Sequence, residues 1–225
     1  MKEALGWHWP DGERHMIEWM ETPKNARLLN GRWAYQGKKQ EIVRQVCTDM
    51  THMRTAVDVG AHIGLWSFNL AHWFQMVRAF EPVAAHRECF EKNVTTGDGE
   101  VILFATALGR EEGQISMRVN PISTGDSWVD PAAKGNYNIP MKTLDSFELQ
   151  DVDLIKIDCE GFEENVVRGA EATIKRWKPV VIVEQKRDMA TKFGLQPLGA
   201  VEVLKKHHGY RQAFEIGGDY VMVPR

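Results

Sequence analysis

The amino-acid sequence predicts an α/β protein built around a mostly parallel sheet. Short apolar runs alternate with amphipathic stretches of helix length, which is the pattern of βαβ units. Residues 180–183 are apolar at every position, as expected for a strand that is buried on both faces of a sheet. The chain ends in two strand-like runs joined by Gly217 and Gly218, and this pair favours a tight antiparallel hairpin.

Local signals place the other elements in order along the chain. Residues 55–59 are a mainly β-branched run ending in Asp-Val-Gly, which indicates a strand leading into a turn. Further strands made mainly of apolar residues are expected at 77–80, 101–107 and 153–157. Amphipathic stretches predict helices at 65–74, 84–94, 163–176 and 198–207. The hairpin strands are placed at 210–216 and 220–223.

Residues 111–143 interrupt this alternation. Short strands are expected at 115–119 and 138–141, on either side of a loop that includes 121–127 and 130–131. A long loop inside a compact domain is often functional. Because this loop follows the third strand, we expect it to border a site at the carboxyl edge of the sheet.

Length, charge and cysteine content narrow the class of protein. The 225 residues carry a net charge of -3 with a pI near 6.3, which argues against a dedicated nucleic-acid binder. The 3 cysteines are scattered and lack zinc spacing, so neither a disulfide framework nor a structural metal site is expected. No signal-peptide core and no apolar run of about 20 residues is found, so we expect a soluble, cytoplasmic protein without a membrane partner.

A glycine-containing turn, Asp58-Val59-Gly60-Ala61-His62-Ile63-Gly64, follows the first predicted strand. Glycines let a backbone turn tightly and approach a ligand closely. The helix predicted next would offer free N–H groups to a carboxylate or another polar group. The dinucleotide fingerprint needs glycine at position 62, where this chain has His, so a pyrophosphate is disfavoured. The alternative is a tight strand–helix turn that binds nothing.

Acidic residues follow three of the predicted strands. Glu81, followed by Pro82, comes directly after strand 77–80 and suits a carboxylate that accepts hydrogen bonds from ribose hydroxyls. Asp158 and Glu160 follow strand 153–157 and are candidates for a catalytic base, a metal ligand or a helix cap. Glu184 adds a carboxylate at the same edge, and we interpret it as an ordinary strand-end residue.

Five strings in a fixed order make the sequence specific to one family: AVDVGAHIGLWS (56–67), AFEP (79–82), ATALG (105–109), LIKIDCEGFEENVVRGA (154–170) and VVIVEQ (180–185). Together they resemble the FkbM family of S-adenosylmethionine (SAM)-dependent methyltransferases over about residues 49–184. The resemblance implies a Rossmann-like class I methyltransferase fold, with a mostly parallel seven-stranded sheet and a C-terminal antiparallel hairpin. Cys159 stands where the family usually has a small aliphatic residue, and we interpret it as a packing substitution.

The resemblance also implies roles for individual residues. It places these residues around SAM: Asp58, Gly60, Ala61, His62 and Gly64 at the methionine end, Glu81 and Pro82 at the ribose, and Ala107 and Leu108 near the adenine. Asp158 and Glu160 would lie close to the transferred methyl group, with Asp158 also touching the cofactor. For His62 a plain place in the first turn of the helix is an equal alternative.

The implied reaction is O-methylation of a hydroxyl on a sugar or other small molecule by in-line methyl transfer. Asp158 or Glu160 is the candidate base, and the partner is a small-molecule or glycan acceptor. The tetrapeptide [D/N]-P-P-[Y/F] of many amino-methyltransferases is replaced here by Asp-Cys-Glu-Gly, which favours oxygen over nitrogen. A hydrated Mg²⁺ held by Asp158, Glu160 and Glu184 is a second option. An NAD-dependent oxidoreductase and a non-catalytic SAM-binding protein are the alternatives.

An extension of 49 residues precedes the methyltransferase domain predicted at 50–225, and it is too short for a stable core of its own. It contains half of the 8 tryptophans: Trp7, Trp9, Trp19 and Trp33. We expect these rings to anchor the extension on the domain, the alternative being an acceptor-site lid that stacks on a sugar. Lys38 and Lys39 are expected on the solvated surface, Asn93 at a helix C-terminus as a cap, and the pair at 207–208 near the end of a helix.

Overall fold

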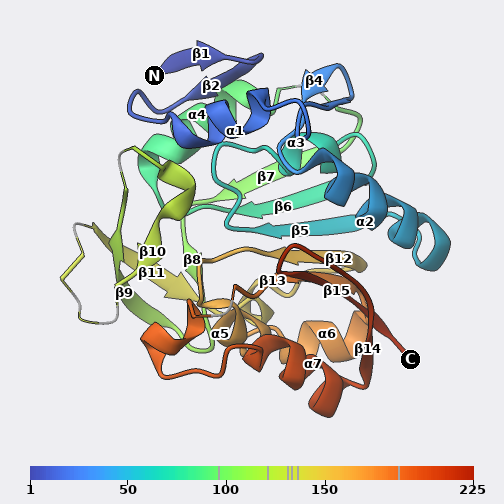
Figure 1. Ribbon diagram of the computed structural model, residues 1–225. Coiled ribbons are helices and arrows are strands. Elements are labelled where there is room, and N and C mark those ends of the chain that lie inside the picture. The colour runs from blue at the N-terminus through green and yellow to red at the C-terminus, as the bar shows by residue number, and fades with distance from the viewer. Residues whose placement is uncertain (96, 121, 131, 133, 136, 187) are drawn as a thin grey trace.

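A seven-stranded sheet with helices on both faces forms the body of the computed structural model, which describes residues 1–225 except 96, 121, 131, 133, 136 and 187 (Figure 1). The strands lie in the order β14-β15-β13-β12-β5-β6-β7. Their bounds are β5 (Thr55–Val59), β6 (Met76–Phe80), β7 (Glu100–Phe104), β12 (Val152–Ile157), β13 (Val180–Glu184), β14 (Tyr210–Ile216) and β15 (Asp219–Pro224). The predicted fold class is therefore confirmed, hairpin included.

The register of the parallel strands brings their carboxyl ends to one edge. Val59 of β5 pairs with Phe80 of β6 and with Ile157 of β12, and Ile157 pairs with Val183 of β13. Strand order reverses between β5 and β12, which is where open α/β sheets bind ligands. The residues that directly follow these strands must therefore meet at the switch point.

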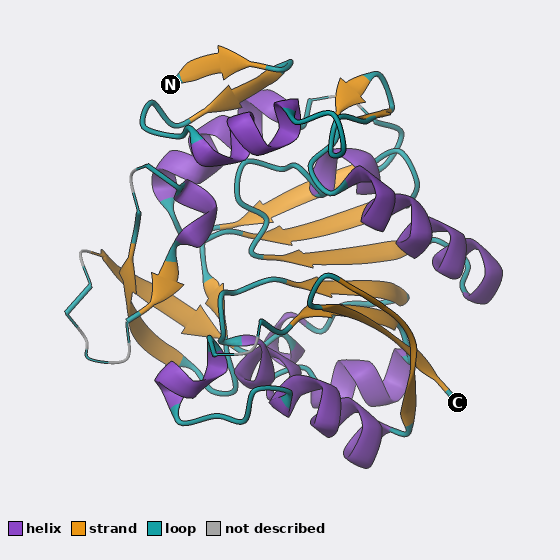
Figure 2. Cartoon of the chain, in the orientation of Figure 1, coloured by secondary structure: helices purple, strands orange, loops and turns teal. Residues whose placement is uncertain are grey.

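Alternate residues of the central strands enter two different cores. Ala56, Leu154 and Ile182 pack against the layer of α2 (Gly37–Met50) and α3 (Ser67–Leu70), seen at the right and upper part of Figure 2. Their neighbours Val57 and Ile155 pack against the opposite layer, α5 (Glu163–Arg168), α6 (Glu171–Trp177) and α7 (Gly199–His208). Burial on both faces explains why residues 180–183 of β13 are apolar at every position.

Two predicted helices are shorter than expected. The helix at 65–74 contracts to α3, because the N–H groups of His72 and Trp73 bond to carbonyls only three residues back and the last turn tightens. The helix at 163–176 divides into α5 and α6 at Gly169 and Ala170. Glycine is needed at 169, because a Cβ there would lie 1.9 Å from the Gly109 carbonyl oxygen. Helix α4 (Ala84–Asn93) matches its prediction to within one residue.

The segment after β7 builds a second sheet with the order β10-β9-β11-β8. Its strands are β8 (Ala107–Leu108), β9 (Gly113–Arg118), β10 (Trp128–Val129) and β11 (Tyr137–Lys142). The strand predicted at 101–107 thus divides between two sheets, while the short strands predicted at 115–119 and 138–141 exist as β9 and β11. The described residues also include the 3-10 turns η1 (Thr124–Asp126), η2 (Asp145–Phe147) and η3 (Ala190–Phe193). Loop positions 121 and 131 lie outside the described residues.

Residues 1–36 of the N-terminal extension lie across the upper helices as two small hairpins and a helix, and the rest of the extension forms most of α2 (Figure 1). These are β1 (Lys2–Ala4), β2 (Trp7–Trp9), α1 (His15–Glu21), β3 (Leu28–Leu29) and β4 (Arg32–Trp33). Trp7 and Trp9 are both 0% exposed and share a core with Ile63 and Phe68. The extension is therefore packed onto the domain through its first two tryptophans.

Asn93 fastens this extension to the domain, which corrects its interpretation as a helix cap. Its side-chain oxygen accepts the His8 backbone N–H at 2.7 Å, and its amide donates to the carbonyls of His8 and Ile63, each at 2.9 Å. The Asn93 side chain therefore binds strand β2 and the turn at Ile63, and it does not cap the end of α4.

Within the described part of the chain, no helix has the length and apolar character needed to cross a bilayer.

Candidate active site at the sheet edge

Two adjoining cavities lie at the carboxyl edge of the sheet. The large cleft has a volume of about 640 Å³, and the small pocket beside it has about 80 Å³. Gly60, His62, Asp158 and Glu160 line both cavities. Of the other predicted site residues, Ala61 lines the large cleft, whereas Glu81, Pro82, Ala107 and Leu108 line the small pocket.

Asp58 lies beneath the site and lines neither cavity. It is 0% exposed, accepts a hydrogen bond from Ser67 Oγ at 2.6 Å and forms an ion pair with Lys156 Nζ at 3.0 Å. The same ammonium donates to the carbonyl oxygen of Gly60 at 2.9 Å. Burial opposes the charge of Lys156, but the carboxylates of Asp58 and Asp158 outweigh it and raise the pKa of this lysine. Asp58 thus fixes the turn through a charged lysine.

The two glycines of the turn serve contacts inside the protein. Gly60 has φ +74°, and a Cβ on it would lie 2.0 Å from the Asp158 carbonyl oxygen. Gly64 has φ +92°, and a Cβ on it would lie 2.4 Å from a methyl of Val94. Gly60 therefore lets β12 end beside the turn, and Gly64 lets α4 pack close. Helix α3 begins only at Ser67, so His62 lies in a turn at φ 52° and not in a first helical turn.

Glu81 is a buried carboxylate with three hydrogen-bonding neighbours. Its oxygens accept the backbone N–H groups of His62 and Val83, both at 2.8 Å, and Oε1 lies 3.2 Å from His86 Nδ1. Burial opposes ionisation, but the charge and hydrogen bond of His86, with those two N–H groups, lower the pKa of Glu81. An ionised Glu81 thus faces the small pocket.

A series of hydrogen bonds joins the extension to the glycine turn, and no sequence pattern indicated it. Glu13 Oε2 accepts two hydrogen bonds from Thr124, one from the backbone N–H at 2.6 Å and one from the side-chain hydroxyl at 2.5 Å. The same hydroxyl oxygen, Thr124 Oγ1, lies 2.8 Å from His62 Nε2. Burial, then His86 and Lys156, lower the pKa of His62 well below its usual value, so this ring is neutral. Glu13 and Thr124 are 111 positions apart, and no local motif could have paired them.

Three carboxyl groups meet at the inner end of the large cleft. Oxygens of Asp158, Glu160 and Glu184 lie within 4.8 Å of one another, so Glu184 belongs to the cluster and is not an ordinary strand-end residue. Burial and the Asp158 charge raise the pKa of Glu184 strongly and that of Glu160 to about 7. Burial favours a higher pKa for Asp158, but the charge of Lys156 and a hydrogen bond from Glu184 outweigh it and lower the pKa. Asp158 is therefore ionised beside a protonated Glu184.

The charges around this cluster do not fit a bound Mg²⁺. Lys186 Nζ lies 3.1 Å from Glu184 and 3.6 Å from Glu160, and Lys156 lies on the side of Asp158. Mg²⁺ prefers carboxylates that are free to bind it in octahedral geometry, whereas the Lys186 ammonium already occupies the side of Glu160 and Glu184 where a cation would bind. We therefore derive no step that passes through a metal.

The extension supplies one wall of the large cleft. Trp19 and Tyr35 line it with their ring centroids 5.0 Å apart. Burial, followed by the charges of Asp158 and Glu184, raises the pKa of Tyr35, which therefore stays a phenol next to the cluster. The four tryptophans thus divide: Trp7 and Trp9 anchor the extension, Trp33 packs against the same core, and Trp19 faces the cleft.

The remaining sequence candidates take structural places. Cys159 packs against the main core, and burial raises the pKa of its thiol, which fits the expected packing role. His207 and His208 end α7 ahead of Gly209, as predicted. Lys39 departs from expectation, because it is only 8% exposed and forms a buried ion pair with Asp219 at the start of β15. Lys38 is exposed on the lining of the large cleft.

Comparison with known proteins decides the family. The model of the FkbM methyltransferase domain matches residues 58–212, which is more than half of the chain. The chain belongs to the FkbM family of SAM-dependent methyltransferases. A curated relative, Methyltransferase 1 of Beauveria bassiana, is 26% identical over 168 residues, which cover 60% of this chain and 67% of that protein.

Solved structures support the fold of this FkbM protein. A methyltransferase FkbM from Methylobacillus flagellatus aligns with a TM-score of 0.50 and 18% identity over 75% of this chain, and the aligned part spans 42% of that structure. A putative caffeoyl-CoA O-methyltransferase from Staphylococcus aureus aligns with a TM-score of 0.52 and 12% identity, covering 94% of this chain and 91% of that one. Both place the chain among class I methyltransferase folds.

Proposed function

We propose that this FkbM protein transfers the methyl group of SAM to a hydroxyl oxygen of a sugar or another small molecule. The observation that carries the proposal is the position of Asp158 and Glu160, which line both the small pocket and the large cleft. A methyl donor reaching in from one cavity and an acceptor in the other would meet at these carboxyl groups. Glu160, with a pKa of about 7, is suited to accept a proton at neutral pH.

In this proposal the cofactor would lie in the small pocket, with its methionine end reaching the border of the large cleft. Gly60, Ala61 and His62 would lie at the methionine end, and Glu81 would accept the ribose hydroxyls. Ala107 and Leu108 would contact the adenine at the far side of the small pocket.

The small pocket is too small for a whole cofactor as it stands. Pockets that enclose whole ligands measure about 300–1,000 Å³, whereas this one measures about 80 Å³. We therefore expect η1, which carries Thr124, to move away from His62 when the cofactor binds.

The chemistry needs positioning and one proton acceptor. SAM supplies a methyl group that is already activated by its sulfonium. The acceptor oxygen donates an electron pair to the methyl carbon while the carbon–sulfur bond breaks, and the hydroxyl proton passes to Glu160. Alignment of two reactants and exclusion of water contribute about 7–11 kcal/mol in favourable cases. Asp158, held ionised by Lys156, would help to orient the hydroxyl.

Cofactor binding tests this proposal against its alternatives. Isothermal titration of the full chain with S-adenosylhomocysteine (SAH) and with NADH should show binding of SAH alone. Tight NADH binding without SAH binding would favour the oxidoreductase. A screen with radiolabelled SAM and pooled sugars and phenols should then give transfer to an oxygen. SAH binding without transfer to any pool would favour a non-catalytic SAM-binding protein.

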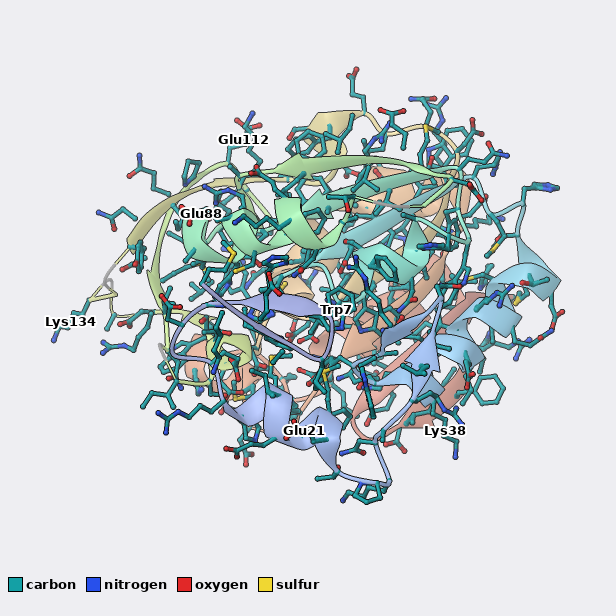
Figure 3. The ribbon with its side chains drawn as sticks, turned by 90° about the horizontal axis from the view of Figure 1, so that it is seen from above. Trp7, Glu21, Lys38, Glu88, Glu112 and Lys134 are labelled. Carbon is teal, nitrogen blue, oxygen red and sulfur yellow. The ribbon has the colours of Figure 1, made fainter. Side chains whose placement is uncertain are left out.

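Replacing Glu81 with Gln should weaken SAH binding by about 10–100-fold, because hydrogen bonds to a charged acceptor contribute about 1.5–3 kcal/mol. The amide keeps the size of the side chain but removes the charge that faces the small pocket. Titration calorimetry measures the Kd, and Glu88→Gln on the exposed face of α4 is a matched control (Figure 3). An unchanged Kd for the Glu81 variant would remove this residue from the cofactor site.

A further inference from the structure

The outer part of the large cleft carries positive charge without matching negative charge. Its lysine and arginine residues mostly have partners within the described residues: Lys39 pairs with Asp219, Lys156 with Asp58, Arg27 with Glu41, and Lys186 with Glu160 and Glu184. Lys24 and Lys38 also line the cleft and are exposed, and neither forms an ion pair with a residue that the structure describes. Both come from the N-terminal extension, whose edge at Lys38 is seen in Figure 3.

The acidic side chains at the cleft lie toward its inner end. Asp158, Glu160 and Glu184 form the inner cluster with Lys156 and Lys186. Asp126 of η1 is exposed, but its charge acts on Glu160 of the inner cluster, and its carboxylate accepts a hydrogen bond from the Ser123 hydroxyl. The free ammonium groups of Lys24 and Lys38 are thus left to meet a ligand.

Aromatic rings connect the inner carboxyl groups with these lysines. Tyr35 lies close enough to Asp158 and Glu184 for their charges to raise its pKa. The Tyr35 ring contacts Trp19, and the Trp19 carbonyl accepts the side-chain amide of Asn25, the residue next to Lys24, at 3.0 Å. Lys38 lies three residues beyond Tyr35 in the first turn of α2. The cleft therefore runs from carboxyl groups past an aromatic surface to free cations.

We propose that the acceptor is an anionic sugar, such as a sugar phosphate or a uronic acid. Its ring would lie against Trp19 and Tyr35, since aromatic faces pack well on the C–H faces of sugars. Its phosphate or carboxylate would lie at Lys24 and Lys38, and the hydroxyl to be methylated would reach Glu160. This inference rests on the proposed function and adds the charge of the substrate to it.

A competing role for the two lysines is to bind the carboxylate of the methionine end of the cofactor. The two roles give different results for a double variant, Lys24→Gln/Lys38→Gln. A substrate site predicts that SAH binding stays within about twofold of the wild type. A cofactor site predicts a loss of SAH affinity of tenfold or more. Lys134→Gln/Lys175→Gln removes the same charge from exposed positions outside the cleft and is the matched control.

The experiment measures the affinity of SAH-saturated protein for glucose, glucose 6-phosphate and glucuronate by ligand-detected NMR. For wild type and control, at least one anionic sugar should bind ten or more times tighter than glucose. In the Lys24/Lys38 variant this preference should fall below threefold. The two anionic probes distinguish a phosphate from a carboxylate.

Several results would overturn the inference. Equal affinity of the wild type for neutral and anionic sugars would do so, as would an unchanged preference for the anionic sugar in the Lys24/Lys38 variant. Failure of an SAH-binding protein to bind any of the three sugars would also overturn it. A tenfold loss of SAH affinity in the Lys24/Lys38 variant would assign the two lysines to the cofactor instead. In each case the proposed methyl transfer could still stand. A wild-type protein that does not bind SAH would instead overturn the proposed function, and the inference with it.

Discussion

Replacing Glu160 with Gln is expected to lower kcat for methyl transfer by about 10²–10⁴, the usual contribution of a positioned general base. The side chain is only 8% exposed at the meeting point of the two cavities, and burial with the Asp158 charge raises its pKa to about 7. Gln keeps the shape but cannot accept the hydroxyl proton. SAH affinity should change little, because the loss is in the chemical step. Steady-state transfer from radiolabelled SAM, with SAH calorimetry, measures both.

The pH profile gives this prediction its direction. A base acts in its ionised form, so wild-type kcat/KM should fall about tenfold per pH unit below pH 7 and level off above it. In the Gln variant this acid limb should disappear. If Asp158 were the base, the limb would lie in the acid range instead, because its pKa is lowered. The profile therefore separates the two candidates.

The matched control for Glu160 is Glu112→Gln, an exposed carboxylate directly before β9 that lines neither cavity (Figure 3). It should keep wild-type turnover. Wild-type kcat in the Glu160 variant, with folding confirmed by circular dichroism, would show that the base lies elsewhere.

Replacing Trp7 with Ala should lower the free energy of unfolding by about 3–5 kcal/mol, as for other large-to-small changes at fully buried aromatic residues. The indole is 0% exposed and contacts the edge of Phe68 at 5.4 Å between centroids. Its Nε1–H donates to the Trp33 carbonyl at 2.7 Å, which would lose its partner. Urea unfolding followed by circular dichroism measures the change.

Two further variants keep the stability prediction testable. Trp7→Phe retains most of the ring, so it should fold and lose less stability even if the Ala variant fails to fold. Trp19→Ala, at the partly exposed wall of the cleft, should cost much less than Trp7→Ala. Equal losses at Trp7 and Trp19 would contradict the division of the tryptophans into anchor and cleft wall.

The sequence alone determined the sheet and the edge at which the site lies. Short apolar runs separated by helix-length amphipathic stretches specified the strands, and Gly217-Gly218 specified the hairpin. In a parallel sheet the carboxyl ends share one edge, so Glu81, Asp158 and Glu160 had to come together once the strands were known. That reasoning depends only on local pattern and topology.

Tertiary structure decided the environment of each group. Asp58 and Gly64 belong to the predicted motif, yet they contact Lys156 and Val94 inside the protein. Glu184 looks like any strand-end carboxylate until burial beside Asp158 protonates it. The chain from Glu13 through Thr124 to His62 joins segments far apart in sequence. Burial and pairing depend on which segments pack together, and local sequence does not encode those distant partners.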